Sequence, residues 1–160
     1  MADPRDGRRS RRHPLTPMST LARLAATSPD ITAIPVSTVM SREVLVVDPR
    51  DPVVEVWQRM QDVSTELAVV REATRVVAVV SQRTLTARWP SGGPEAMRRL
   101  LVRDVIEPGT PTLHGDATVH EAADLIIRFE LEGVPVVTAG GELLGLVTPA
   151  ELVRLLAREP

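Results

Sequence analysis

Three histidines and the acidic residues near two of them are the side chains in this sequence best suited to bind a metal or move a proton. His13 lies near the N-terminus, and His114 and His120 lie close to Asp116 and Glu121. We place His120 on the polar side of a helix and His114 in a turn, so the sequence does not predict two ligands on one face. It also lacks a G-x-S-x-G motif and a glycine-rich fingerprint after a strand. We therefore expect no metal site, no catalytic residues and a protein that is not an enzyme.

Two residue types that carry much enzyme chemistry are missing. The chain has no cysteine, which excludes thiol nucleophiles and disulfides and is typical of a cytoplasmic protein. All 19 basic residues are arginines, which excludes Schiff-base lysines and a P-loop. The formal net charge of −2 favours no nucleic-acid or membrane surface, and no apolar run approaches the ~18 residues of a membrane span. A cytoplasmic globular protein of 160 residues, from a bacterium with a GC-rich genome, is therefore expected.

Hydroxyl, carboxylate and arginine side chains stand at the expected starts of two helices. Residues 148–151 (TPAE) form a capping-box pattern from Thr148 to Glu151, with proline at the first helical position. Ser81 fits an N-cap, and the nearby Arg83 could pair with a phosphate or carboxylate. Two interpretations stay open: these side chains bind a ligand, or they cap helices beside a solvated arginine.

An internal repeat positions these residues. Residues 39–60 match residues 105–126 at an offset of 66, and residues 67–85 match residues 134–152 at an offset of 67. Helical spacing predicts amphipathic helices over 53–60 and 119–126. Each helix is followed by two short apolar runs that predict a buried hairpin, at 67–80 and 134–147. Since roughly 60 residues are marginal as an independent domain, the two copies are expected to share a core.

Each copy carries its own start signals. Asp51-Pro52 predicts an N-cap followed by proline at the first helical position, and Thr118 with Glu121 predicts a capping box. A strand precedes each helix, at 44–47 and about 111–113, and a final helix begins near Ser81 and near Thr148. Each repeat is therefore strand, helix, strand, strand, helix. We divide the chain into a disordered arginine-rich tail (1–14), a helix at 15–26 with a lead-in (15–34), a first repeat (35–88), a linker with a helix at 94–101 (89–101) and a second repeat (102–158).

The repeats resemble the CBS domain, and the chain resembles a stand-alone bacterial tandem pair of such domains, called a Bateman module. This resemblance implies an α+β fold in which two tandem β-α-β-β-α repeats are related by a pseudo-twofold axis, with their sheets facing each other. The matching segments are 102–106 (VRDVI), 133–137 (GVPVV), 142–148 (ELLGLVT) and 149–152 (PAEL) in the second copy, and 36–41 (VSTVMS) and 76–85 (VVAVVSQRTL) in the first.

The resemblance implies a non-catalytic regulatory or sensor module that needs no cofactor and binds AMP, ADP, ATP or S-adenosylmethionine in the cleft between repeats. In the family, a [ST]-x-x-D motif opens the last helix, with its hydroxyl near the phosphates and its aspartate on the ribose. Glu151 stands at the aspartate position of the second copy and Thr84 at that of the first. We therefore expect the stronger site at the second copy. The candidate ligand-binding residues are Thr148, Glu151, Val134, Pro135, Ile106, Met40, Ser81 and Arg83.

The expected partners are a small adenosyl ligand, a second copy of the chain in a homodimer, and a protein that the sequence does not identify. The alternative is a degenerate CBS pair that binds no ligand and acts in dimerisation or protein interaction through helices such as 53–60 or 119–126. A weaker hypothesis gives the arginines from Arg5 to Arg12 a role in nucleic-acid binding. No membrane partner is expected.

Overall fold

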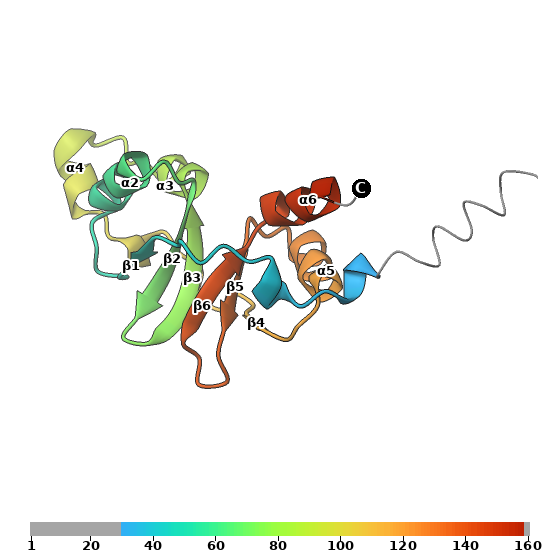
Figure 1. Cartoon of the computed structure of the whole chain (residues 1–160). Helices are drawn as coiled ribbons and strands as arrows, with labels where there is room; N and C mark the ends of the chain where they lie inside the picture. The colour runs from blue at the N-terminus through green and yellow to red at the C-terminus, as the bar shows by residue number, and fades with distance from the viewer. Residues whose placement is uncertain (1–29, 159–160) are drawn as a thin grey trace, which may run out of the picture. The chain divides into compact units, whose positions relative to one another are not determined.

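Two three-stranded sheets organise the computed structural model, which describes residues 30–158 (Figure 1). The predicted tail at 1–14 and helix at 15–26 lie outside the described residues. The first repeat contains β1 (Val46–Val47), α2 (Val53–Asp62), β2 (Leu67–Glu72), β3 (Arg75–Ser81) and α3 (Gln82–Ala87). The second contains β4 (Leu113–His114), α5 (Val119–Phe129), β5 (Val134–Val137), β6 (Leu143–Val147) and α6 (Pro149–Arg158). The α+β class and the order of elements within each repeat are confirmed.

The two sheets have the same topology and the same irregularity. In each, a two-residue strand pairs parallel to the middle strand, which pairs antiparallel to the third. The register shifts after Val70 in the first hairpin and after Val136 in the second. The turn of the first hairpin places Ala73 at a φ of 52°, whereas Gly141 takes a φ of 86° in the second. Glycine adopts such a conformation without steric cost, so the second turn is the easier to build, as the sequence indicates.

The lead-in of each repeat is the segment that precedes its first strand, starting at Val36 in the first repeat and at Val102 in the second. Each lead-in is hydrogen-bonded to the other repeat. Val36, in the 3-10 helix η2 (Val36–Thr38), donates its backbone N–H to the Ala117 carbonyl at 2.7 Å. Val102, in η3 (Val102–Asp104), donates to the Asp51 carbonyl at 2.9 Å. These bonds are equivalent at the 66-residue offset, as expected for a pseudo-twofold relation. The two repeats therefore form their cores together.

The two core clusters show the same exchange of lead-ins between the repeats. One buried cluster contains α2, β2 and β3 residues together with Val102 and Val105, and the other contains α5, β5 and β6 residues together with Val36 and Met40. Val36 and Val102 are both fully buried. Each cluster thus needs residues from both repeats, since burying a valine side chain stabilises by about 1.5–3 kcal/mol.

Of the caps predicted for α2 and α5, the cap of α5 is confirmed and the cap of α2 is wrong. Thr118 accepts from the Glu121 N–H at 3.2 Å, while Glu121 Oε2 accepts from the Thr118 N–H at 2.7 Å. This backbone hydrogen bond, with a second one from the Thr118 hydroxyl, lowers the pKa of Glu121. The N-cap of α2 is Pro52 rather than Asp51. Asp51 lies one residue outside the helix, and its Oδ2 accepts instead from the Asp48 N–H at 2.9 Å.

The linker lies against the helices of the first repeat. Its predicted helix is α4 (Gly93–Arg99), which packs on α2. Trp89 contacts Trp57 of α2 edge to face, with ring centroids 6.0 Å apart. The linker therefore covers part of the α2 surface.

Candidate functional site

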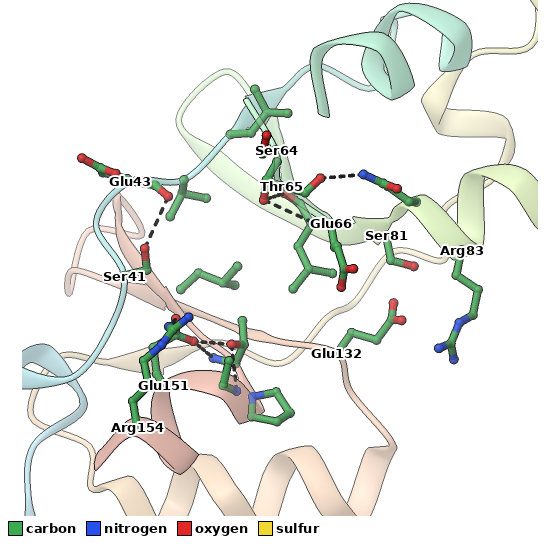
Figure 2. Close-up of a pocket in the computed structure, with 18 residues that line it drawn as sticks. Ser41, Glu43, Ser64, Thr65, Glu66, Ser81, Arg83, Glu132, Glu151 and Arg154 are labelled. Atoms are coloured by element: carbon green, nitrogen blue, oxygen red, sulfur yellow. Dashed lines mark hydrogen bonds and ion pairs between the residues drawn. The ribbon is translucent and has the colours of Figure 1, made fainter. Parts of the chain in front are cut away.

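A cavity of about 530 Å³ lies between the two repeats, within the usual range for small-molecule sites. Segments from both repeats line it: the lead-in to β1, the start of β2 and the start of α3 from the first, and the start of α6 from the second (Figure 2). The lining residues are Ser41, Glu43, Val44, Leu45, Ser64, Thr65, Glu66, Leu67, Ser81, Gln82, Arg83, Glu132, Leu146, Thr148, Pro149, Ala150, Glu151 and Arg154.

A close backbone contact fixes the lead-in beside β6. The N–H of Ser41 donates to the Leu146 carbonyl and the N–H of Leu146 donates to the Ser41 carbonyl, both at 2.9 Å. This approach requires a glycine at position 145, because a Cβ there would lie 2.6 Å from the Ser41 carbonyl oxygen. The lead-in wall of the cavity is therefore held by a residue of the opposite repeat.

The start of α6 forms part of the capping box predicted from Thr148 to Glu151: the carboxylate accepts from the Thr148 N–H, but the Thr148 hydroxyl accepts from the Ala150 N–H rather than from the Glu151 N–H. Glu151 Oε2 accepts from the Thr148 N–H at 2.8 Å and from the Thr148 hydroxyl. Its Oε1 is 3.0 Å from Arg154 Nη1. The Ala150 N–H donates to Thr148 Oγ1 at 3.2 Å. Both oxygens of the carboxylate are therefore bonded within the helix, and its side chain is only 12% exposed.

The start of α3 is capped in a similar way. Ser81, which is 3% exposed, accepts from the Thr84 N–H at 3.0 Å. The Gln82 N–H donates to the Glu66 carbonyl at 2.9 Å, and the Gln82 side chain donates to the Thr65 carbonyl at 2.8 Å. These bonds tie α3 to the loop before β2.

Charged side chains without a partner also border the cavity. Arg83 is exposed and makes no ion pair within residues 30–158. The same holds, over that part of the chain, for the carboxylates of Glu43, Glu66 and Glu132. The candidate residues expected from the sequence do not include these three glutamates, although Glu66 and Glu132 are equivalent at the 66-residue offset. That equivalence was the available signal, since equivalent positions near a twofold axis lie close together.

The structure brings four of the eight candidate residues into this one cavity: Ser81, Arg83, Thr148 and Glu151. Ile106 lines a different cavity of about 450 Å³, together with Thr84 and the lead-in to β4.

Val134 and Pro135 are fully buried in β5, and Met40 is 8% exposed and packs in the second core cluster. These three side chains do not line the 530 Å³ cavity or the cavity of Ile106. Contact of any of the eight candidate residues with a ligand stays a prediction.

Residues 30–158 contain no group of three or more histidine, aspartate or glutamate side chains placed to hold a metal ion. In the same part of the chain, no helix has the length and apolar character needed to span a membrane.

Known proteins share both the sequence pattern and this architecture. Residues 36–89 and 102–158 match the family model for the CBS domain. Inosine-5'-monophosphate dehydrogenase of Korarchaeum cryptofilum is 30% identical over 111 residues, which are 69% of this chain and 22% of the dehydrogenase.

Two solved structures are similar in fold. CBSX2 from Arabidopsis thaliana in complex with AMP has a TM-score of 0.67 at 22% identity, covering 78% of this chain and 96% of that one. The CBS domain pair of MJ0100, in complex with 5'-methylthioadenosine and S-adenosyl-L-methionine, has a TM-score of 0.69 at 16% identity, covering 80% and 99%. The chain thus spans less than a quarter of the dehydrogenase and almost all of the two CBS pairs.

Proposed function

Because this chain belongs to the CBS-domain family, we propose that it is a non-catalytic regulatory module that binds an adenosine-containing ligand between its two repeats. The observation that carries the proposal is the 530 Å³ cavity, which both repeats line. CBSX2 in complex with AMP and MJ0100 in complex with S-adenosylmethionine are similar in fold and support the ligand class. No cofactor is needed for this role.

The lining suits a nucleoside. Leu45, Leu67 and Leu146 offer apolar contact to a flat base, and the hydroxyls of Ser41 and Thr65 lie at the same cavity. The cleft therefore offers apolar contact and hydrogen-bonding groups together, and small-molecule sites combine these two features. The base is expected to lie against the leucines and the ribose near the polar residues.

A ligand in this cavity would act on the packing of the two repeats. The lead-in wall is bonded to β6, while the opposite wall belongs to α3 and β2. A ligand that contacts both walls favours the arrangement in which they are correctly spaced. It shifts the equilibrium only by the difference in its affinity for the two arrangements, which is how a sensor domain responds.

The experiment is a ligand titration by calorimetry and thermal shift with AMP, ATP, S-adenosylmethionine and 5'-methylthioadenosine. At about 100 times Kd, binding should add about 2.7 kcal/mol to the unfolding free energy. Ala150→Trp places a bulky ring in the cavity from an exposed position on α6 and should weaken binding by at least about tenfold. Ala157→Trp, at an exposed position on the last turns of α6, is the matched control and should bind like the wild type.

The proposal fails if none of the four compounds binds at millimolar concentration. It also fails if Ala150→Trp and Ala157→Trp bind equally well.

A second candidate function, homodimerisation, is favoured by an apolar face on the second repeat. Ile127 on α5 and Val153 and Leu156 on α6 are 78%, 63% and 59% exposed. The equivalent helices of the first repeat carry Gln61 and Thr86 at the first two positions. There, the linker helix α4 lies against α2. The asymmetry favours a dimer in which the α5–α6 faces of two copies meet.

Light scattering tests this second candidate. Ile127→Ser should dissociate the dimer, whereas Val63→Ser, at a position 59% exposed beside α2, should leave it intact. A wild-type monomer at 100 μM, or an intact dimer in both variants, would contradict it.

A further inference from the structure

The start of α6 borders the cleft, yet its groups are already paired within the chain. The Thr148 N–H is bonded to Glu151 Oε2, and the Ala150 N–H is bonded to Thr148 Oγ1. Pro149, at the first helical position, has no N–H to donate. A helix N-terminus attracts anions through its unpaired N–H groups and its dipole. Here the chain's own carboxylate occupies that position, so a ligand phosphate would have to displace it.

Two N–H groups at the start of α3 are engaged as well. The Gln82 N–H is bonded to the Glu66 carbonyl, and the Thr84 N–H is bonded to the Ser81 hydroxyl. Two N–H groups at each helix start are therefore engaged within the chain, which leaves fewer backbone donors to cradle a phosphate.

The free side-chain charges around the cleft are mainly negative. Glu151 and Arg154 pair with each other and cancel. Within residues 30–158, the unpaired charges that border the cleft are one positive charge, on Arg83, and three negative charges, on Glu43, Glu66 and Glu132. Figure 2 shows Glu66 and Glu132 extending into the cleft from the two repeats, with Arg83 beside them, while Glu43 points away. The interior of the cleft thus has a negative potential.

We propose that this cleft selects an adenosyl ligand whose 5' substituent is uncharged or cationic, a thioether or a sulfonium, over a nucleotide. Glu66 and Glu132 are the residues that set the selection. A phosphate placed among these carboxylates is repelled, whereas a sulfonium or ammonium group pairs with them. Both glutamates are exposed, so salt screens these effects. This inference rests on the proposed function, since it concerns the ligand of the same cavity.

The first test is a calorimetric series of four ligands that share adenosine and differ in the charge of the 5' substituent: ATP, AMP, 5'-methylthioadenosine and S-adenosylmethionine. The Kd should fall along this series, with S-adenosylmethionine bound at least about tenfold more tightly than ATP in 50 mM salt. Raising the salt to 500 mM should narrow the ratio, because counterions screen charges at a solvent-accessible site.

The second test is the double variant Glu66→Gln with Glu132→Gln, which removes two charges and keeps the side-chain size. The affinity for S-adenosylmethionine should drop and that for AMP should rise, each by about fivefold or more. The affinity for uncharged 5'-methylthioadenosine should stay within about twofold, which separates charge from damage to the fold. Glu142→Gln, at an exposed position at the other end of β6, is the matched control and should leave all four values unchanged.

The possible results distinguish this inference from the proposed function. If ATP or AMP binds as tightly as S-adenosylmethionine, the cleft is an adenosyl site and the inference is wrong. The inference is also wrong if the double variant changes the Kd of all ligands, 5'-methylthioadenosine included, by the same factor. If no ligand binds, the proposed function falls and the inference falls with it.

Discussion

A methyl group at position 145 should disrupt the contact between the two repeats. The Cβ of an alanine there would lie 2.6 Å from the Ser41 carbonyl oxygen and 2.8 Å from the Met40 sulfur, where ordinary contact begins at 3.4 Å. Met40 can shift, but the Ser41 oxygen is backbone that accepts from the Leu146 N–H. The lead-in must therefore move away from β6.

We estimate the cost from two effects. Overpacking in a well-packed region costs about 1–3 kcal/mol, and each of the two weakened Ser41–Leu146 hydrogen bonds contributes about 1 kcal/mol. Gly145→Ala should therefore lower the unfolding free energy by about 3–5 kcal/mol, measured by urea denaturation at pH 7. Because the lead-in lines the cavity, ligand affinity should fall as well.

Gly140→Ala is the matched control in the same hairpin. Its Cβ would have only the Thr138 hydroxyl near it, at 3.7 Å. Its effect should stay within about 0.5 kcal/mol, as for most surface substitutions. If Gly145→Ala is as stable as Gly140→Ala, the lead-in is not held against β6 as described and the reasoning is refuted.

Three further predictions concern caps, pH and the exchanged lead-ins. Thr118→Ala should lower the unfolding free energy by about 1 kcal/mol in urea denaturation, because Thr118 caps α5. Thr112→Ala, at an exposed position outside any helix, is the control and should leave the stability unchanged. Equal stability of the two variants would contradict the capping role. Since the pKa of Glu121 is lowered in the folded state, its contribution is present at neutral pH and is lost as the pH falls below about 4. The difference in unfolding free energy between the wild type and Glu121→Gln should therefore shrink as the pH falls below about 4 in urea denaturation. A difference that stays constant would contradict the stabilising role of the Glu121 carboxylate. Val36→Ala and Val102→Ala should each cost about 2 kcal/mol while unfolding stays a single transition, and a second transition would show that the repeats fold separately.

Local patterns predicted the elements well. The apolar spacing that predicts helices at 53–60 and 119–126 is a property of short segments, and α2 and α5 follow it with two or three more residues at the C-terminal end. The capping box at Thr118 was recognised because its two partners are three residues apart. Asp51 was misassigned because the competing partner, the Asp48 N–H, lies in a loop whose course the sequence does not reveal.

The site was harder to predict, since it depends on contacts between distant segments. The motif residues Thr148 and Glu151 lie at the cavity as expected. The exchange of lead-ins, however, places residues 41–45 beside α6 and leaves Ile106 in the other cavity. The repeat alignment shows which positions are equivalent, but it does not show which lead-in packs on which sheet. The sequence shows that Glu66 and Glu132 are equivalent, but only the folded chain shows that both border the cleft.

Glu151 affects both the stability of α6 and the choice of ligand. A carboxylate three residues after Thr148 stabilises the start of α6 by accepting the Thr148 N–H, and it thereby fills the place where a phosphate would gain most from the helix dipole. A ligand that needs this place must break the cap, at a cost of about 0.5–2 kcal/mol, before it gains any contact. A ligand that leaves the cap intact has no such cost and meets Glu66 and Glu132 instead. The chain's stability and its choice of ligand should therefore change together: Glu151→Ala should destabilise α6 and, by opening the helix start, improve the relative affinity for AMP.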